Sequence, residues 1–356
     1  MVKTIYIHIG GYNKGTSVLQ KFLSENRVAL KNKGYLYPGR SPGHHEMVKG
    51  LKTQLPPEGV KPQDPIIHKY LEEIKTSKCD NIILSSEGFE KLGKSIENLK
   101  LFFNDRSIIK IIFYITRQDE QLEAVYHQRV LQNGVRLDIA FTDFFRGFNF
   151  DSLNYFSILK RWEQAFGKEN IIVRCYDKEQ MPEGIYSDFL ECIGLTLDEN
   201  YSVLKRTPNH YLNWDFIEVI RICNSHFKDN IAFHRFLVQS LEQVNSTIEE
   251  EREILLSPLK RTDTIARYTE SNAKVAREYL GRPDGRLFYA SLPDLDESWK
   301  PYDGLTVEKI VPIFTQMMFN LESKYQRQRK TIENRRLNRR ILIGLKKIGR
   351  RLGLLE

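Results

Sequence analysis

The sequence predicts the α/β fold class, in which a parallel sheet is flanked by helices, with a helical C-terminal extension. The first observation is a series of short apolar runs separated by stretches of helical periodicity; the runs span 4–8, 81–87, 108–117 and 170–176. Apolar strands that alternate with helices are typical of parallel sheets built from βαβ units. The second observation is that strand patterns fade after about Leu195, where helical periodicity continues alone.

The chain opens with a strand, a glycine-rich turn and the start of a helix. Residues 4–8 are mostly β-branched or aromatic, which favours a strand, and Gly10, Gly11 and Gly15 follow. A helical apolar pattern then begins at 16–17, a Thr-Ser pair suited to a helix start. This order predicts a P-loop-like parallel sheet, whose loop presents backbone N–H groups and a helix dipole to a phosphate or sulfate. A simple tight turn is the alternative interpretation.

The glycine loop departs from that of a nucleoside-triphosphate-binding protein at its end. Gly10 and Gly15 have the expected spacing, but Thr16 and Ser17 stand where a lysine and a hydroxyl residue would contact phosphates and magnesium. Lys14 precedes the second glycine instead. We therefore expect no metal site and no ATP chemistry. The loop favours a donor with a good leaving group, such as a phosphosulfate.

The segments between the strands complete the predicted order of elements. Residues 37–65 are rich in Pro, Gly and His and are predicted to form a substrate-facing loop. A helix leads from there to Cys79, and later helices are expected to break near Pro258 and at 281–285. In the helix before the last strand, the aromatic residues Trp162 and Phe166 are predicted to lie in the core.

Polar residues stand at the ends of three predicted strands. His8 closes the first strand, the segment 85–87 (Ser-Ser-Glu) closes the second, and Arg117 closes the third. In open parallel sheets, ligands bind beyond the carboxyl ends of the strands. We therefore expect these side chains to meet at one edge of the sheet.

Composition limits the class of protein further. Hydrophobic residues make up 41% of the 356 residues and aromatic residues 11%, so a sizeable core is expected. We see neither eighteen consecutive apolar residues nor a secretory leader pattern. The four cysteines lack the short paired spacing of a zinc site or a disulfide framework, which favours reduced thiols and a cytoplasmic location.

Charge separates the C-terminal tail from the rest of the chain. From Lys324 onward there are twelve Lys and Arg residues against two Glu, so the preceding residues carry a net charge of −2 although the whole chain carries +8. We expect an α/β core in 1–200, a helical part of the same domain in 201–323 and a basic tail helix in 324–356. Basicity confined to a tail argues against nucleic acid as the partner of the body.

The tail itself has an amphipathic pattern. Its apolar residues recur at a spacing of three or four, on one helix face, with cations elsewhere; they are Leu337, Ile341, Leu345, Ile348 and Leu352. Residues 335–352 are therefore predicted to lie on an anionic membrane surface. Packing against the body or a protein partner is the alternative, and nucleic acid is disfavoured because no aromatic residues are interleaved.

Several motifs point to one family. Residues 8–20 and 117–130 contain the two best matches, and looser ones follow in order at 34–38, 85–87, 159–176, 188–194 and 271–288. Together they resemble the bacterial carbohydrate sulfotransferases, which use 3′-phosphoadenosine-5′-phosphosulfate (PAPS) on a P-loop-like fold. The resemblance covers most of residues 4–290, and it implies that the core is a PAPS-binding domain.

The resemblance assigns the nucleotide-binding residues. It implies that the 5′-phosphosulfate is held by the glycine loop, comprising Gly10, Gly11, Asn13, Lys14, Gly15, Thr16 and Ser17. Arg117 would grip the 3′-phosphate through its guanidinium, although Ala124 replaces the serine usual on the following helix. A surface ion pair is the alternative role for Arg117. The family lysine that neutralises the bridging oxygen falls on Asn13, so Lys14 would have to take over that catalytic role.

Three residues are candidate general bases. Glu87 resembles the family's strand-end glutamate, and His44 and His45 resemble its histidine pair. A carboxylate with a pKa raised by burial, or an imidazole near neutral pH, takes a proton from an acceptor hydroxyl. The alternatives are a structural or helix-capping carboxylate and solvated loop histidines. His8 is expected to orient the loop.

The sequence thus predicts a cytoplasmic sulfotransferase, peripheral on the inner face of the membrane. It would transfer the sulfuryl group of PAPS, without a metal, to a hydroxyl or amine of a bacterial cell-surface glycan. A nucleotide-binding scaffold protein that lost transfer through Asn13 is the main alternative. A kinase acting on a glycan or lipid is a weaker one.

Overall fold

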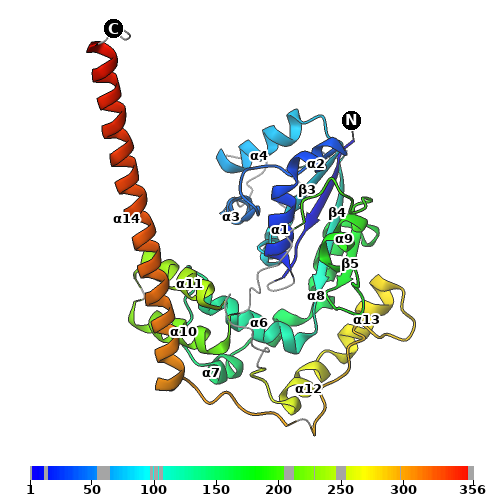
Figure 1. The fold of residues 1–356 in the computed structure, drawn as a ribbon. Coiled ribbons are helices and arrows are strands. Elements are labelled where there is room, and N and C mark those ends of the chain that lie inside the picture. The colour runs from blue at the N-terminus through cyan, green and yellow to red at the C-terminus, as the bar shows by residue number, and fades with distance from the viewer. Residues whose placement is uncertain are drawn as a thin grey trace. The chain divides into compact units, whose positions relative to one another are not determined.

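A computed structural model gives the fold of the chain (Figure 1). It describes residues 2–11, 15–53, 65–96, 99, 103, 107–203, 212–227, 229–245, 254–296 and 298–351, with the backbone alone at 94 and 336–351. The chain divides into two units. The first comprises 1–132, 139–207 and 254–302, and the second comprises 133–138, 208–253 and 303–356.

The first unit contains a sheet and the helices that pack on it. In chain order its elements are β1 (Thr4–His8), α1 (Thr16–Glu25), α2 (Arg27–Asn32), β2 (Tyr35–Leu36), α3 (His45–Thr53), α4 (Pro65–Thr76), β3 (Asn81–Ser85), the 3₁₀ helices η1 (Phe89–Lys91) and η2 (Gly93–Ser95), β4 (Ile108–Ile115), α6 (Gln118–Leu131), α7 (Phe141–Arg146), η3 (Phe150–Leu153), α8 (Tyr155–Phe166), η4 (Lys168–Asn170), β5 (Ile171–Cys175), α9 (Gly184–Cys192), α12 (Pro258–Ala266) and α13 (Thr269–Leu280).

The five strands form one parallel sheet in the order β2-β3-β1-β4-β5. The first strand lies at its centre, so that His8 pairs with Ser85 of β3 on one side and with Ile112 of β4 on the other. The fold class expected from the sequence, a parallel sheet flanked by helices with helices following it, is confirmed. All four predicted strands are present, and the two-residue edge strand β2 was not predicted.

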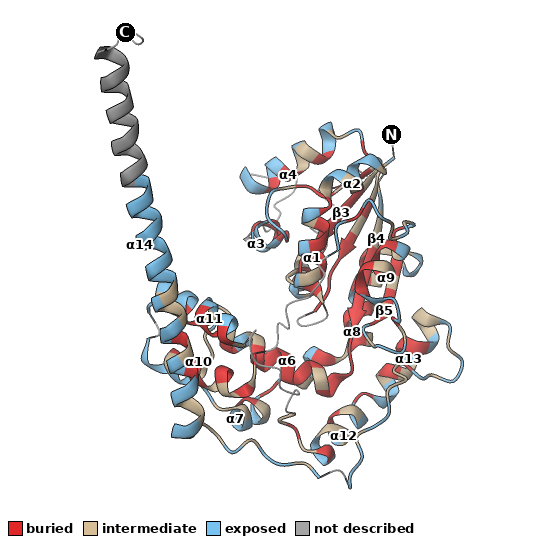
Figure 2. Ribbon diagram, in the orientation of Figure 1, coloured by how far each residue is buried: buried red, intermediate tan, exposed pale blue. Residues whose placement is uncertain are grey.

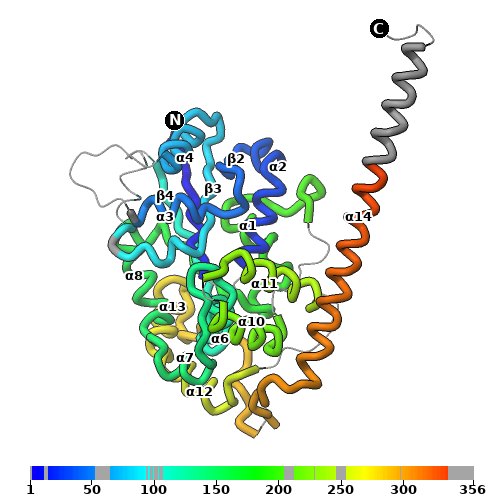
Figure 3. Tube along the Cα trace, turned by 90° about the vertical axis from the view of Figure 1, so that its left-hand side faces the viewer, coloured from blue at the N-terminus to red at the C-terminus, as the bar shows by residue number. Residues whose placement is uncertain are grey.

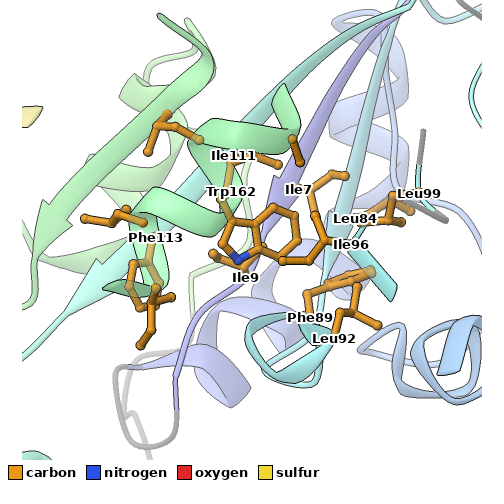
Figure 4. Packing of buried hydrophobic residues seen from close by; sticks show 14 of the residues in the cluster. Ile7, Ile9, Leu84, Phe89, Leu92, Ile96, Leu99, Ile111, Phe113 and Trp162 are labelled. Atoms are coloured by element: carbon orange, nitrogen blue, oxygen red, sulfur yellow. The ribbon is translucent and has the colours of Figure 1, made fainter. Parts of the chain in front are cut away.

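The two faces of the sheet have separate cores, because side chains alternate along a strand. On one face, α3, α4, α8 and α13 cover Ile5, Ile7 and their neighbours, and the indole of Trp162 lies among them (Figure 4). On the other face, α1, α2 and α9 cover Ile83, Ile112 and Tyr114. Figure 2 shows the strands as almost wholly buried, as sheets with helices on both faces are. Trp162 and Phe166 pack in the first core as predicted.

The segment 37–65 differs from the loop expected there. Helix α3 begins at His45 within it, and the reason is an apolar pattern that proline, glycine and histidine had obscured. Met47, Val48 and Leu51 lie on one side of α3 and are buried in the core. The expectation of a continuous loop was wrong, and part of this segment, 54–64, lies outside the described residues.

The second unit is helical and contains α10 (Trp214–His226), α11 (Ile231–Asn245) and α14 (Val307–Arg351). Figure 3 shows α14 as a single long helix. Its side chains Ile313 and Met317 are buried, whereas Val311 and Met318 are exposed, so one side of this helix packs within the unit. The helix expected for 335–351 is the last part of α14, and α14 passes without a break through the boundary expected at 324.

Candidate functional site

The glycine loop joins the central strand β1 to α1, at the carboxyl edge of the sheet (Figure 1). A Cβ atom on Gly10 would lie 2.4 Å from Nε2 of His8 and 2.8 Å from Oγ1 of Thr16. Gly15 has a left-handed backbone (φ +68°), and a Cβ there would lie 2.6 Å from Cδ1 of Ile185. Both positions therefore require glycine, which is the requirement of a tightly folded loop.

The first turn of α1 follows directly from this loop. Thr16 is buried, and its hydroxyl donates to the carbonyl oxygen of Gly11 at 3.0 Å. Gly15 is the N-cap, and no described side chain caps the helix. A first turn that no described side chain caps is the arrangement that phosphate-binding helix ends use. Ser17 is exposed in that turn, and Asn13 and Lys14, which were predicted to bind the phosphosulfate, lie outside the described residues.

The carboxyl end of β3 gathers the predicted histidines. Nδ1 of His8 lies 2.8 Å from Oγ of Ser85, and Nδ1 of His45 lies 2.9 Å from Oγ of Ser86. The backbone N–H of Ser85 donates to Nδ1 of His44 at 3.0 Å. Sequence reasoning placed His8 and Ser85 at neighbouring strand ends, and the structure brings all three histidines to this segment.

His44 is wholly buried and both of its ring nitrogens have backbone partners. Because Nδ1 accepts from the Ser85 N–H, the proton of the neutral ring lies on Nε2 and is donated to the Pro38 carbonyl at 3.0 Å. Burial lowers the pKa of His44 from 6.5 to about 4. A neutral imidazole whose two nitrogens are both hydrogen-bonded is suited to holding the segment around Pro38 and β3 together. We therefore interpret His44 as a positioning residue.

Glu87 and His45 lie side by side just beyond the end of β3. Oε2 of Glu87 lies 3.7 Å from Nδ1 of His45, and the carboxylate side chain is 20% exposed. Gln20, which is buried in α1, donates from Nε2 to the same Glu87 oxygen at 3.2 Å. The pair is therefore oriented by the helix whose amino end belongs to the glycine loop. Gln20 is the last residue of the motif at 8–20, and no role was predicted for it.

Arg117 stands at the end of β4, and all three of its guanidinium nitrogens are hydrogen-bonded. Nε and Nη2 donate to the two carboxylate oxygens of Asp119 at 2.8 and 3.0 Å, and Nη1 donates to the Ser291 carbonyl at 2.7 Å. Arg261 of α12 donates to Asp119 as well, at 2.8 Å. The Arg117 pair is buried instead of lying on the surface. A 3′-phosphate at this position would share the guanidinium with Asp119.

A cavity of about 350 Å³ opens between η1, α6, η3 and α8, a size suited to a small ligand. Two of these elements lie just after the strand ends: η1 follows Glu87 closely, and α6 follows Arg117. In α6, Gln121 lines the cavity and accepts from the hydroxyl of Thr116 at 3.0 Å. The sequence gave no sign of this cavity, because its walls come from four separate segments with no shared motif.

Two further observations concern metals and membranes. Within the described ranges, no three His, Cys, Asp or Glu side chains gather in a way that would hold a metal ion. In the same part of the chain, no helix combines the length and apolar character that crossing a bilayer requires.

Comparison with known proteins gives three results. No protein-family model matches the chain. An uncharacterized protein from Archaeoglobus fulgidus is 30% identical over 202 residues, which are 56% of this chain and 54% of that protein, so the match spans about half of the relative's length. A sulfotransferase from Alicyclobacillus acidocaldarius is similar in structure, with a TM-score of 0.39 and 13% identity over 67% of this chain and 97% of that one.

Proposed function

We propose that the chain is a sulfotransferase that transfers the sulfuryl group of PAPS to a hydroxyl or amine of a bacterial cell-surface glycan. The observation that carries the proposal is the link from α1 to Glu87 through Gln20. The link joins the amino end of α1, which no described side chain caps, to the side chains of Glu87 and His45. Such a helix end suits a phosphate, and a carboxylate beside an imidazole suits the removal of a proton.

The chemistry follows from these positions. Glu87, with His45 beside it, takes the proton of the acceptor hydroxyl as the acceptor oxygen forms a bond to sulfur. The bond between sulfur and the bridging oxygen of PAPS breaks, and the nucleotide phosphate leaves with the bonding electrons. The first-turn amides of α1 stabilise the charge that develops there, with Lys14 as their partner in this proposal.

The residues around the loop fit a nucleotide phosphate in one further respect. Glycine at position 10 lets the loop backbone pack directly on His8 and Thr16, with which a methyl group there would collide. Arg117 would hold the 3′-phosphate from the neighbouring strand end. This co-substrate supplies an activated sulfuryl group, and the chain's own residues supply orientation, charge and a base.

Calorimetry and a transfer assay test the proposal. We expect adenosine 3′,5′-bisphosphate to bind more tightly than adenosine 5′-monophosphate, and labelled PAPS to transfer sulfate to a bacterial glycan extract. We expect Glu87→Gln to lower the transfer rate by about 10²- to 10⁴-fold with nucleotide binding retained, because it removes a general base. Glu46→Gln changes an exposed neighbour of His45 and should leave the rate unchanged. Failure of both nucleotide binding and transfer would contradict the proposal.

A nucleotide-binding scaffold is the second candidate, and Asn13 favours it because the family lysine is missing there. This candidate predicts binding of adenosine 3′,5′-bisphosphate without transfer. Asn13→Lys would then restore measurable transfer. If the native chain already transfers sulfate and Lys14→Ala abolishes it, Lys14 has taken over the role and the scaffold candidate is excluded.

We also propose that residues 335–352 place the enzyme on the cytoplasmic, anionic face of a membrane. The cations and apolar residues of this segment support the proposal. The backbone of α14 is helical through Arg351, which is the conformation an amphipathic anchor needs.

A further inference from the structure

The cavity between η1, α6, η3 and α8 carries an excess of positive charge at its walls. Its cations are Lys91, Arg129 and Arg161, and its acidic side chains are Glu90 and Asp151. In the part of the chain that the structure describes, neither Arg129 nor Arg161 has an ion-pair partner, although Arg129 lies over the ring of Phe144 at 5.4 Å. Two exposed guanidinium groups beside a cavity, neither of them held in an ion pair with a described residue, favour an anionic ligand.

Part of the cavity wall is apolar. Val125, Leu153 and Ile158 line it, and each is buried. Tyr155 also lines it, but its hydroxyl donates to the Thr116 carbonyl at 2.7 Å. A ligand that fits has an apolar face for these side chains and an anionic group for the two arginines.

The cavity lies on the acceptor side of the proposed reaction. Its lining comes from η1, which closely follows Glu87, and from α6, while the described glycine-loop residues do not line it. A cavity whose wall includes the segment that follows the proposed base, and that the described glycine-loop residues do not line, suits the molecule that loses the proton. This placement rests on the proposed function.

We propose that this cavity binds an acidic saccharide, a sugar with a carboxylate or another anionic group, as the sulfate acceptor. Arg129 and Arg161 bind the anionic group, and the carbon–hydrogen face of the ring packs on Val125, Leu153 and Ile158. The acceptor class is therefore an acidic glycan, in place of a neutral one.

Binding of a matched pair of saccharides without PAPS tests this proposal. The probes are a hyaluronan tetrasaccharide, which contains glucuronate, and the same tetrasaccharide with its carboxyl groups reduced to alcohols. Isothermal titration with the whole chain should show at least tenfold tighter binding of the acidic probe. This preference should weaken as salt rises, because exposed charges are screened.

Variants assign the preference to the cavity. We expect the double variant Arg129→Gln/Arg161→Gln to lose at least tenfold in affinity for the acidic probe and little for the reduced one. Asp151→Asn should raise affinity for the acidic probe about twofold. Arg146→Gln removes an exposed, ion-paired arginine outside the cavity and should change neither value.

Three outcomes overturn the inference. Equal binding of the two saccharides, or no binding of either, shows that the cavity does not select an acidic sugar. Unchanged binding of the acidic probe in the double variant places the sugar elsewhere. Loss of adenosine 3′,5′-bisphosphate binding in the double variant assigns the cavity to the nucleotide. If the native chain binds adenosine 3′,5′-bisphosphate but does not bind the acidic saccharide, the acceptor assignment is wrong and the sulfotransferase proposal is retained.

Discussion

His44 and His45 are adjacent residues with opposite surroundings, and those surroundings decide what each can do. Both nitrogens of His44 are bonded to backbone atoms in the core, whereas the ring of His45 is 52% exposed beside Glu87. Of the two rings, only that of His45 has surface open to an incoming acceptor. A pair that looks like two equal candidates therefore contains one candidate base and one structural residue.

Burial of His44 predicts a loss of stability in acid. Its pKa falls from 6.5 in the unfolded chain to about 4 in the fold. Between these values the unfolded chain binds a proton that the folded chain does not, so the free energy of unfolding decreases as the pH falls from 6.5 to 4. The loss should amount to about 3 kcal/mol in chemical denaturation. His44→Gln should remove that part of the pH dependence, and an unchanged profile would show that His44 titrates normally.

Gly15 gives a prediction about the glycine loop. We expect Gly15→Ala to lower the free energy of unfolding by about 2–4 kcal/mol, since it combines left-handed strain with a contact to Ile185. Gly281 has a similar backbone (φ +64°) with nothing within 4 Å of a Cβ atom. Gly281→Ala should therefore lose only about 1 kcal/mol. Equal losses in the two variants, measured by chemical denaturation, would mean that the Ile185 contact relaxes freely.

At the scale of elements, the carboxyl ends of β3 and β4 are held by polar contacts to helices. Gln20 ties α1 to Glu87, and Asp119 ties Arg117 to Arg261 of α12. Asp119 is wholly buried, so its three charge-assisted hydrogen bonds are formed away from water. These contacts orient helices that the apolar cores alone would leave free to slide.

The Asp119 contact gives a prediction about the connection between α6 and α12. Asp119→Ala leaves two arginines facing each other without their carboxylate, and we expect a loss of about 3–5 kcal/mol in the free energy of unfolding. Asp143→Ala breaks an ion pair of exposed residues and should lose less than about 1 kcal/mol. A small effect at Asp119 would show that water replaces the carboxylate.

The elements also show what the sequence could predict. The strands β1, β3, β4 and β5 were predictable because each is an apolar run bounded by polar or turn residues, of the kind that a sheet covered on both faces buries. The edge strand β2 has two residues, too few for a periodic pattern, and α3 was hidden by proline and glycine before it. Short elements depend on tertiary packing, which local patterns do not record.

At the scale of the whole molecule, the candidate site was predictable in part. Parallel strand ends converge by topology, so placing His8, Glu87 and Arg117 at one edge needed only the strand assignments. The contact of Arg117 with Ser291, the burial of His44 and the cavity depend on contacts between distant segments. None of these contacts is accompanied by a recognisable spacing of residues in the sequence.

The tail gives a prediction about membranes. A variant that ends at Arg335 loses seven Lys and Arg residues and one Glu. Each basic residue near an anionic surface contributes about 1 kcal/mol, so we expect the variant to bind vesicles containing phosphatidylserine at least about tenfold more weakly. Sedimentation with neutral phosphatidylcholine vesicles is the control. If the full chain binds both kinds of vesicle equally, the tail has another partner.

The central position of β1 has a consequence for synthesis on the ribosome. The strand is made first, yet its partners Ser85 and Ile112 follow far along the chain. At about 5–20 residues per second, an isoleucine-rich segment waits several seconds before either neighbour emerges. During that interval the nascent chain depends on a chaperone, or on rapid synthesis of the partner strands, to avoid aggregation.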